Sequence, residues 1–289
     1  ESNNADSTKD QNTVNINKFE RFLNANNIEN KFESMNLKTI NSYQKYLLDN
    51  GILPNTIKNI IKGTIFPLLR KANKNNEIPF SWHDSNLDSF ELVKDQSNKE
   101  LARNKQVALT EEQLIQIYNF DISKESLQPL YKKNVRDDVL ERFQEVKDIF
   151  LLQAYIGQRI SDIPKIYQNP IDQEHNTITI IQKKTNARAV IPIHPIAKEL
   201  IDKYREKTII NYSVKKKRTA NETIRNLLKV IGKFDEEITY QENGKTITEP
   251  LYELVHTHTA RHTFITIMCR KGAPKQTLIL ATGHENTQI

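Results

Sequence analysis

Residues 256–264 read HTHTARHTF and open a helical pattern in which His258 and Arg261 stand three positions apart. On a helix this spacing places both side chains on one face, about 5–6 Å apart. A guanidinium offers a bidentate fork and an imidazole can donate or move a proton, so the pair could clamp a phosphate. Ordinary polar contacts at a helix end would also explain the pair. His256 and His262 flank it, but no carboxylate stands at metal-ligand spacing, so no metal site is expected.

Three other short segments carry residues of the same chemistry. In AYIGQRISDIPKI, Gly157 is expected to end a helix and Arg159 to lie just beyond it, where an arginine can be aimed at an anion. In QKKTNARAVIPI, Lys184 stands near the tip of a predicted hairpin and could reach into a groove. In ATGHENTQI, Gly283 ends another helix and His284 follows. Taken singly, each position is explained as well by an ordinary surface residue.

The spacing of apolar residues predicts a mainly α-helical chain with one small antiparallel β-hairpin. Apolar side chains recur every three or four positions in residues 14–23, 37–48 and 54–68, and Pro67 is expected to bend the third helix. Another helix is expected from about residue 141 to 155. ITIIQKK and ARAVIPI are short β-rich runs that predict the hairpin. After the hairpin the pattern returns to helices.

This organisation divides the chain into two domains. Residues 1–12 carry almost no apolar side chain and are expected to form a disordered leader. A small helical domain covers residues 13–100, and a polar linker covers 101–107. The second domain, 108–289, begins at LTEEQL, which resembles a helix start with acidic residues in its first turn.

Composition excludes several classes of protein. The 289 residues suit two domains, and 37% hydrophobic residues suffice for a core in each. A single cysteine, Cys269, excludes an internal disulfide framework. No apolar run reaches the roughly 20 residues of a membrane span, and the first residues lack the apolar core of a signal peptide. We therefore expect a cytoplasmic protein, and we expect a fragment because the chain begins with Glu1 and ends at Ile289.

The positive charge is concentrated in one segment. The whole chain has a net charge of +6, while residues 205–233 alone hold nine basic and two acidic residues, a local charge of +7. A localised basic block most often meets a phosphate backbone, although a solvated loop would also explain it.

Taken in their order along the chain, these pieces resemble the tyrosine recombinase, or phage integrase, family, and the resemblance covers nearly the whole chain. QKKTNARAVIPI is similar to the strand-turn-strand that bears the family's catalytic lysine, and HTARHTF is similar to its H-x-x-R-H motif. The resemblance implies a helical, SAM-like core-binding domain followed by an α+β catalytic domain. The richness in Asn and Lys is similar to that of integrases from conjugative elements in the Bacteroidetes.

The resemblance implies a site-specific recombinase that cuts and rejoins DNA strands through a 3′-phosphotyrosine, to integrate or excise a mobile element. Arg159 and Arg261 would neutralise the scissile phosphate, and Lys184 would protonate the departing 5′ oxygen. His258 would assist proton transfer at the nucleophile, and His284 would donate a hydrogen bond to the phosphate. No cofactor is expected, because the tyrosyl ester retains the bond energy needed for rejoining.

The resemblance also implies supporting residues and partners. Asp162 matches an acidic position that supports the site from behind. The family's nucleophilic tyrosine would fall near position 293, after Ile289, so this fragment is expected not to cleave DNA. The expected partners are double-stranded DNA at the nucleoid, further protomers in a homotetramer on paired sites, and accessory DNA-bending proteins. DNA contacts are expected from Lys58, Lys62, Lys215, Lys216, Lys217, Arg218, Arg225 and Lys229.

Two rival classes stay open. A sequence-specific DNA-binding protein on an inactive integrase scaffold would keep the basic block but need not keep all five catalytic candidates together. A type IB topoisomerase shares the chemistry but relaxes supercoils without pairing two sites. An RNA- or membrane-binding basic protein is disfavoured, because the sequence has neither an aromatic stacking motif nor a basic amphipathic helix with a bulky apolar face.

Overall fold

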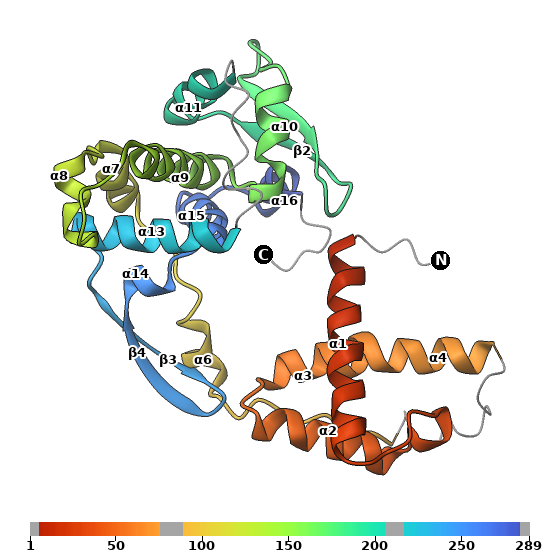
Figure 1. The fold of residues 1–289 in the computed structure, drawn as a ribbon. Coiled ribbons are helices and arrows are strands. Elements are labelled where there is room, and N and C mark those ends of the chain that lie inside the picture. The colour runs from red at the N-terminus through yellow and green to blue at the C-terminus, as the bar shows by residue number, and fades with distance from the viewer. Residues whose placement is uncertain (1–5, 76–88, 206–216, 284–289) are drawn as a thin grey trace. The chain divides into compact units, whose positions relative to one another are not determined.

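The structure is a computed structural model that describes residues 6–75, 89–205 and 217–283 (Figure 1). The chain divides into two compact units, one made of residues 1–98 with 241–245 and the other of the remaining residues. Helices dominate both units, which confirms the expected mainly α fold, and the structure holds two small antiparallel sheets where one was expected. Within the described ranges, no helix is both long enough and apolar enough to cross a membrane.

The first unit is a set of helices around one apolar core. Phe19 and Phe22 of the first helix pack on Tyr43 of the second, with ring centroids 4.7 and 5.0 Å apart. The core continues through Ile57 and Ile61, both fully buried. The elements are α1 (Asp6–Ala25), the 3-10 turn η1 (Phe32–Ser34), α2 (Leu37–Asp49), α3 (Pro54–Ile60), the π-helical segment η2 (Ile61–Ile65) and α4 (Phe66–Lys74).

Helix α1 begins earlier than the sequence predicted. The expectation of a disordered leader over residues 1–12 was wrong from Asp6 onward, and residues 1–5 lie outside the described ranges. Polar side chains stabilise this part of the helix. The hydroxyl of Thr64 in η2 donates to Asn12 Oδ1 at 3.0 Å and accepts from Asn15 Nδ2 at 2.9 Å. These contacts hold the first half of α1 against η2 without an apolar pattern in the sequence.

The irregularity expected at Pro67 takes the form of the π-helical turn η2, which immediately precedes α4. Pro67 lies in the first turn of α4, where its missing N–H leaves a carbonyl of the preceding turn without a helical donor. A π-helical turn widens the backbone at that point, which is a recognised way to accommodate the loss.

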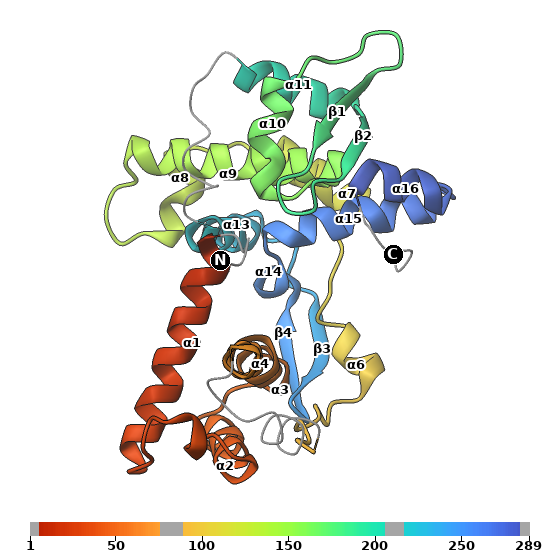
Figure 2. The same ribbon diagram turned by 90° about the vertical axis from the view of Figure 1, so that its right-hand side faces the viewer.

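In the second unit, one long helix forms the centre. Helix α9 (Asp137–Ile156) packs against α7 (Glu111–Asn119), α11 (Pro195–Arg205), α13 (Lys217–Ile231) and α15 (Thr257–Arg270) (Figures 1 and 2). Four successive residues of α9, 149–152, are all buried. A helix buried on every side in this way marks the middle of a core.

Short elements complete the second unit. Helix α6 (Lys99–Arg103) covers the first three residues of the segment predicted as a linker, 101–107, so that segment is not wholly irregular. The remaining helices are α8 (Lys124–Leu127), η3 (Gln128–Leu130), η4 (Ile160–Asp162), α10 (Ile163–Gln168), α14 (Leu251–Leu254) and α16 (Lys275–Thr282).

The predicted hairpin is confirmed. Strands β1 (Thr177–Ile181) and β2 (Arg188–Pro192) pair antiparallel, with Ile181 opposite Arg188. This register leaves residues 182–187 as the connecting loop, and that loop contains Lys184. Helix α16 packs against β2, so the end of α16 lies close to this hairpin.

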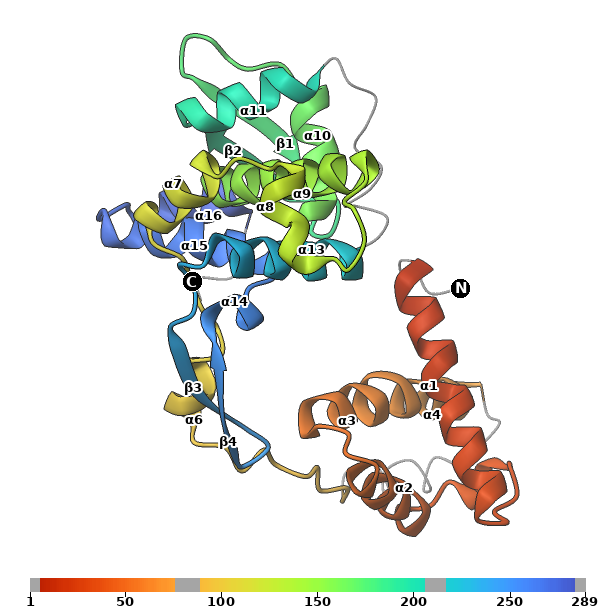
Figure 3. The same ribbon diagram turned by 60° about the vertical axis from the view of Figure 1, so that its left-hand side comes forward.

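A second hairpin was missed. Strands β3 (Glu237–Glu242) and β4 (Lys245–Pro250) pair in a region where the sequence was expected to return to helices (Figure 3). The signal was present: Asn243 and Gly244 have φ values of 52° and 74°, and Asn-Gly between β-rich runs is the strongest short-range hairpin signal.

Candidate catalytic site

One side of the site is formed by the C-terminal end of α9 and the turn that follows it. Gly157 caps α9 in the left-handed conformation, with φ of 67°, and a Cβ there would lie 2.4 Å from the ring of Phe264. Only glycine fits both conditions. The turn leads directly to Arg159, a half-buried residue at the start of η4, whose Nη1 donates to Gln182 Oε1 at 2.7 Å. The helix end thereby aims Arg159 at the loop of the first hairpin.

Arg261 is the buried arginine of the site, with 2% of its surface exposed. Its Nη1 donates to the Gly157 carbonyl at 2.9 Å, and its Nη2 donates to the Thr282 carbonyl at 2.8 Å. Burial, as the larger cause, and the positive charge of Arg159 lower the pKa of Arg261 to about 10, and the negative charge of Asp162 opposes this shift. The guanidinium therefore stays charged at neutral pH, within electrostatic reach of Arg159.

Asp162, which the sequence predicted to support the site, is a buried carboxylate that contacts the hairpin loop. Its side chain is fully buried, and Oδ1 accepts a hydrogen bond from the backbone N–H of Lys183 at 2.7 Å. This bond joins η4 to the hairpin loop one residue before Lys184. The carboxylate also provides the negative charge that partly offsets Arg261.

A single cavity brings together three of the predicted catalytic residues. The cavity has a volume of about 340 Å³, and Arg159 just before η4, Lys184 of the hairpin loop and His258 of α15 all line it. The other lining residues are Gln153, Ile160, Ser161 and Thr257. Two of the lining side chains, Lys184 and His258, are exposed, so the cavity is open to a large ligand.

The three histidines around α15 differ in their surroundings. His258 lies in the first turn, with its ring edge-on to that of His262 at 4.8 Å. Burial and the charge of Arg261 lower the pKa of His262. His256 precedes the helix, and its Nδ1 accepts the backbone N–H of Thr259 at 3.1 Å. Within the described ranges, no group of His, Cys, Asp and Glu is arranged to hold a metal ion.

The last predicted catalytic residue, His284, lies outside the described residues. Gly283 precedes it and ends α16 in the left-handed conformation, with φ of 61°. A Cβ on Gly283 would lie 2.6 Å from the side-chain amide of Gln182. The end of α16 is therefore packed directly on the hairpin loop.

Two buried glutamines of the site were not predicted from the sequence. Gln158 has no exposed surface and Gln182 has 1%, yet both are polar side chains between the arginines of the site. Their amides bond to each other, from Gln182 Nε2 to Gln158 Oε1 at 2.7 Å. No spacing rule marks such residues, because their partners come from segments far apart in the sequence.

The residues expected to contact DNA lie on both units. Lys58 of α3 and Lys62 of η2 are exposed, as is Lys229 of α13. Lys215 and Lys216 lie outside the described residues, and Lys217 and Arg218 belong to the first turn of α13.

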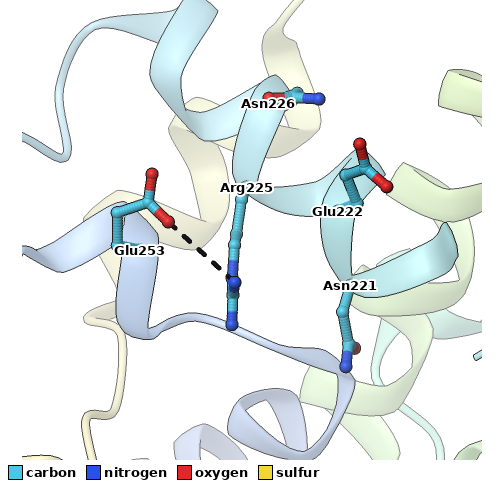
Figure 4. A pocket seen from close by; sticks show the side chains of 5 residues that line it. All are labelled: Asn221, Glu222, Arg225, Asn226 and Glu253. Atoms are coloured by element: carbon cyan, nitrogen blue, oxygen red, sulfur yellow. Dashed lines mark ion pairs between the residues drawn. The ribbon is translucent and has the colours of Figure 1, made fainter. Parts of the chain in front are cut away.

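Arg225 is held by contacts within its own unit. It extends from α13 toward the segment that leads into α15, and it lines a pocket of about 450 Å³ with Asn221 and Glu253 (Figure 4). Its Nε donates to the Val255 carbonyl at 3.2 Å, and its Nη1 lies 3.9 Å from a carboxylate oxygen of Glu253. Asn221 Oδ1 accepts the backbone N–H of Thr257 at 2.9 Å. Both α13 side chains therefore brace the entry to the helix that carries His258.

Comparison with known proteins gives a consistent set of similarities. The sequence profile of the phage integrase family matches residues 107–289. The fold is similar to that of a lambda integrase dimer bound to a COC′ core site, with TM-score 0.61, 16% identity and coverage of 98% of this chain and 87% of that one. It is also similar to the Tn1549 transposon integrase in complex with transposon right end DNA, with TM-score 0.56, 15% identity and coverage of 99% and 88%. No curated protein matches the chain.

Proposed function

Because the chain belongs to the phage integrase family, the tyrosine recombinases that cut and rejoin DNA at specific sites, we propose that the cavity between Arg159, Lys184 and His258 is where the scissile phosphate reacts. This juxtaposition is the observation that carries the proposal. The three residues are distant in the sequence and come from three different segments, and two of them, Lys184 and His258, are exposed.

The proposed reaction is a phosphoryl transfer. A tyrosine oxygen attacks phosphorus, the bond from phosphorus to the 5′ oxygen breaks, and a 3′-phosphotyrosine and a 5′-hydroxyl result. Arg159 and Arg261 stabilise the negative charge that develops on the non-bridging oxygens. Their proximity supports this role, because two cations with one nearby carboxylate, Asp162, leave the site with a net positive charge.

Proton transfers complete the proposed step. Lys184 protonates the departing 5′ oxygen, a general-acid role worth about 10²- to 10⁴-fold in rate. His258 takes part in proton transfer at the nucleophile, and His284 donates a hydrogen bond to the phosphate. Asp162 accepts a hydrogen bond from the backbone N–H of Lys183 and so positions the loop that carries the general acid.

Double-stranded DNA is the proposed partner. One solved lambda integrase structure is a dimer on a core site and another is a tetramer on a Holliday junction, and we extend both kinds of assembly to this protein. The exposed side chains of Lys58, Lys62 and Lys229 are suited to phosphate contacts. The proposed task is integration or excision of a mobile element, in the cytoplasm, where the nucleoid DNA lies.

The deciding experiment looks for the covalent intermediate. A chain continued past Ile289 to include the tyrosine expected near position 293 is mixed with a nicked suicide duplex and resolved on a denaturing gel. We expect a protein–DNA adduct that disappears with Arg159→Ala or Arg261→Ala. The matched control is Arg270→Ala, which removes an exposed arginine from the same helix as Arg261 and should leave the adduct intact.

The same experiment distinguishes the rival classes. If the longer chain binds its element's ends tightly and forms no adduct, the protein is a non-catalytic DNA-binding protein. If it forms the adduct and relaxes supercoiled DNA without needing two specific sites, it acts as a type IB topoisomerase.

A further inference from the structure

We propose that Gln182 is the positioning residue that sets the orientation of Arg159 relative to the loop carrying Lys184. This inference rests on the proposed function, because it assigns Gln182 a task in the same site. Gln182 is the first residue after β1, and only 1% of its surface is exposed. Its side chain does not line the cavity, so it acts through Arg159 and not on the phosphate.

The Gln182 amide makes four hydrogen bonds. Oε1 accepts from Arg159 Nη1 at 2.7 Å and from the Thr185 hydroxyl at 3.0 Å. Nε2 donates to Gln158 Oε1 at 2.7 Å and to the Thr282 carbonyl at 2.7 Å. Both N–H donors of the amide nitrogen and both acceptor sites of the amide oxygen are therefore used. The hydrogen-bonding capacity of the Gln182 side chain is fully satisfied.

The orientation of the Gln182 amide follows from its partners. A guanidinium can only donate, so Arg159 must face the amide oxygen. A backbone carbonyl can only accept, so Thr282 must face the amide nitrogen. A flipped amide would turn both contacts into repulsions. The network thus has one arrangement, and that arrangement fixes where the Arg159 side chain points.

The network also joins three parts of the second unit. Arg159 follows α9, Thr185 belongs to the hairpin loop beside Lys184, and Thr282 is the last residue of α16. Gly283 leaves no space for a Cβ against the Gln182 amide, so the amide cannot shift toward α16. Arg159 and the hairpin loop that carries Lys184 are therefore joined by a single side chain.

A neutral amide suits this position better than a carboxylate. A glutamate would pair with Arg159 and neutralise charge that the phosphate requires, whereas the amide orients the guanidinium and leaves its charge intact. A glutamate would also lack the two donors that Gln158 and Thr282 accept, placing negative charge against two oxygen atoms. The structure thus favours glutamine over its closest isostere.

The test compares two substitutions at this position. Gln182→Met keeps the length of the side chain and removes all four hydrogen bonds, and Gln182→Glu keeps the two acceptors. In the chain continued past Ile289, we expect Gln182→Met to slow single-turnover cleavage of the suicide duplex by about 10- to 100-fold, the cost of a small misplacement of a catalytic group. We expect Gln182→Glu to be slower still. The matched control is Gln173→Met, an exposed glutamine in the turn before β1.

Two further readouts separate positioning from mere support of the fold. DNA affinity of Gln182→Met should stay within about 3-fold of the unchanged chain, because the basic residues are untouched. Thermal melting establishes a temperature at which every variant is folded, and cleavage is compared there. The inference is overturned if Gln182→Met cleaves within about 3-fold of the Gln173→Met control, or if affinity falls in parallel with cleavage.

Two other outcomes are also decisive. If Gln182→Glu is folded and cleaves faster than Gln182→Met, the argument for a neutral amide is wrong. If Gln182→Met does not fold, Gln182→Glu alone decides the test. Cleavage by Gln182→Glu at the rate of the Gln173→Met control overturns the proposal. Arg159→Ala is measured alongside, and if it cleaves like the unchanged chain, the proposed function of the cavity fails instead of the role of Gln182.

Discussion

The two arginines of the site differ in burial and in how many hydrogen bonds they make within the protein. Arg261 is almost fully buried and donates to the carbonyls of Gly157 and Thr282, which end α9 and α16. Arg159 is half-buried and lines the cavity. A substitution at the first therefore removes part of the core's hydrogen bonding, and one at the second mainly alters the cavity.

We expect Arg261→Ala to destabilise the second unit by about 2–4 kcal/mol, because it removes two hydrogen bonds to buried carbonyls and empties a large buried volume. Arg159→Ala should cost about 1 kcal/mol or less, since that side chain is part-exposed. Urea unfolding followed by circular dichroism measures both. Equal losses for the two variants would contradict the structural distinction drawn between them.

Two of the proposed catalytic residues follow directly after helix ends. Both α9 and α16 terminate in a left-handed glycine, and a site residue, Arg159 or His284, follows within two positions. Gly157 is additionally confined by the ring of Phe264 from α15. The helix that carries Arg261 thus packs directly against the turn that presents Arg159, and the glycine permits this close approach.

Gly157→Ala should therefore be more damaging than an alanine at a left-handed glycine with open surroundings. Gly51, which follows α2 with φ of 73°, is the matched control because nothing lies within 4 Å of its Cβ position. We expect Gly51→Ala to cost about 1–2 kcal/mol from backbone strain alone. Gly157→Ala adds overpacking, for a total of about 2–5 kcal/mol. Denaturant midpoints that fall equally for both would show that Phe264 can move aside.

For the whole molecule, the main long-range property is its charge. The net charge is +6, and an excess of +7 lies in residues 205–233, so the rest of the chain is close to neutral. The exposed lysines of the first unit, Lys58 and Lys62, lie about one helical turn apart. If they contact DNA, their contribution must depend on salt, because each phosphate contact releases a counterion.

Replacing Lys58 and Lys62 together by glutamine should weaken DNA binding at low salt and reduce the slope of log affinity against log salt by about 1 for each lysine. The matched control is Lys198→Gln, which removes an ammonium that lies 2.6 Å from Asp202. Fluorescence anisotropy over a range of salt concentrations measures the slopes. A slope unchanged from that of the control would show that neither lysine contacts phosphate.

The elements that were predicted correctly are those with strong local patterns. The helices of the first unit and α9 show apolar periodicity, and the first hairpin shows two β-rich runs. The missed second hairpin had an equally local signal in Asn243 and Gly244, so that error was one of interpretation. The start of α1 had no such signal, because polar contacts to Thr64 stabilise it.

The sequence by itself determined the family motifs, and with them the candidate residues Arg159, Lys184 and His258 and the helix that carries Arg261. Only the tertiary structure decided that three of these line one cavity, that Arg261 is buried, and that Gln182 joins Arg159 to the hairpin loop and to the end of α16. The physical reason is the distance along the chain over which the two kinds of interaction act. Periodicity and turn chemistry depend on neighbours along the chain, whereas the partners of a buried polar group depend on which distant segments pack together, as Gln182 and Thr282 do across 100 positions.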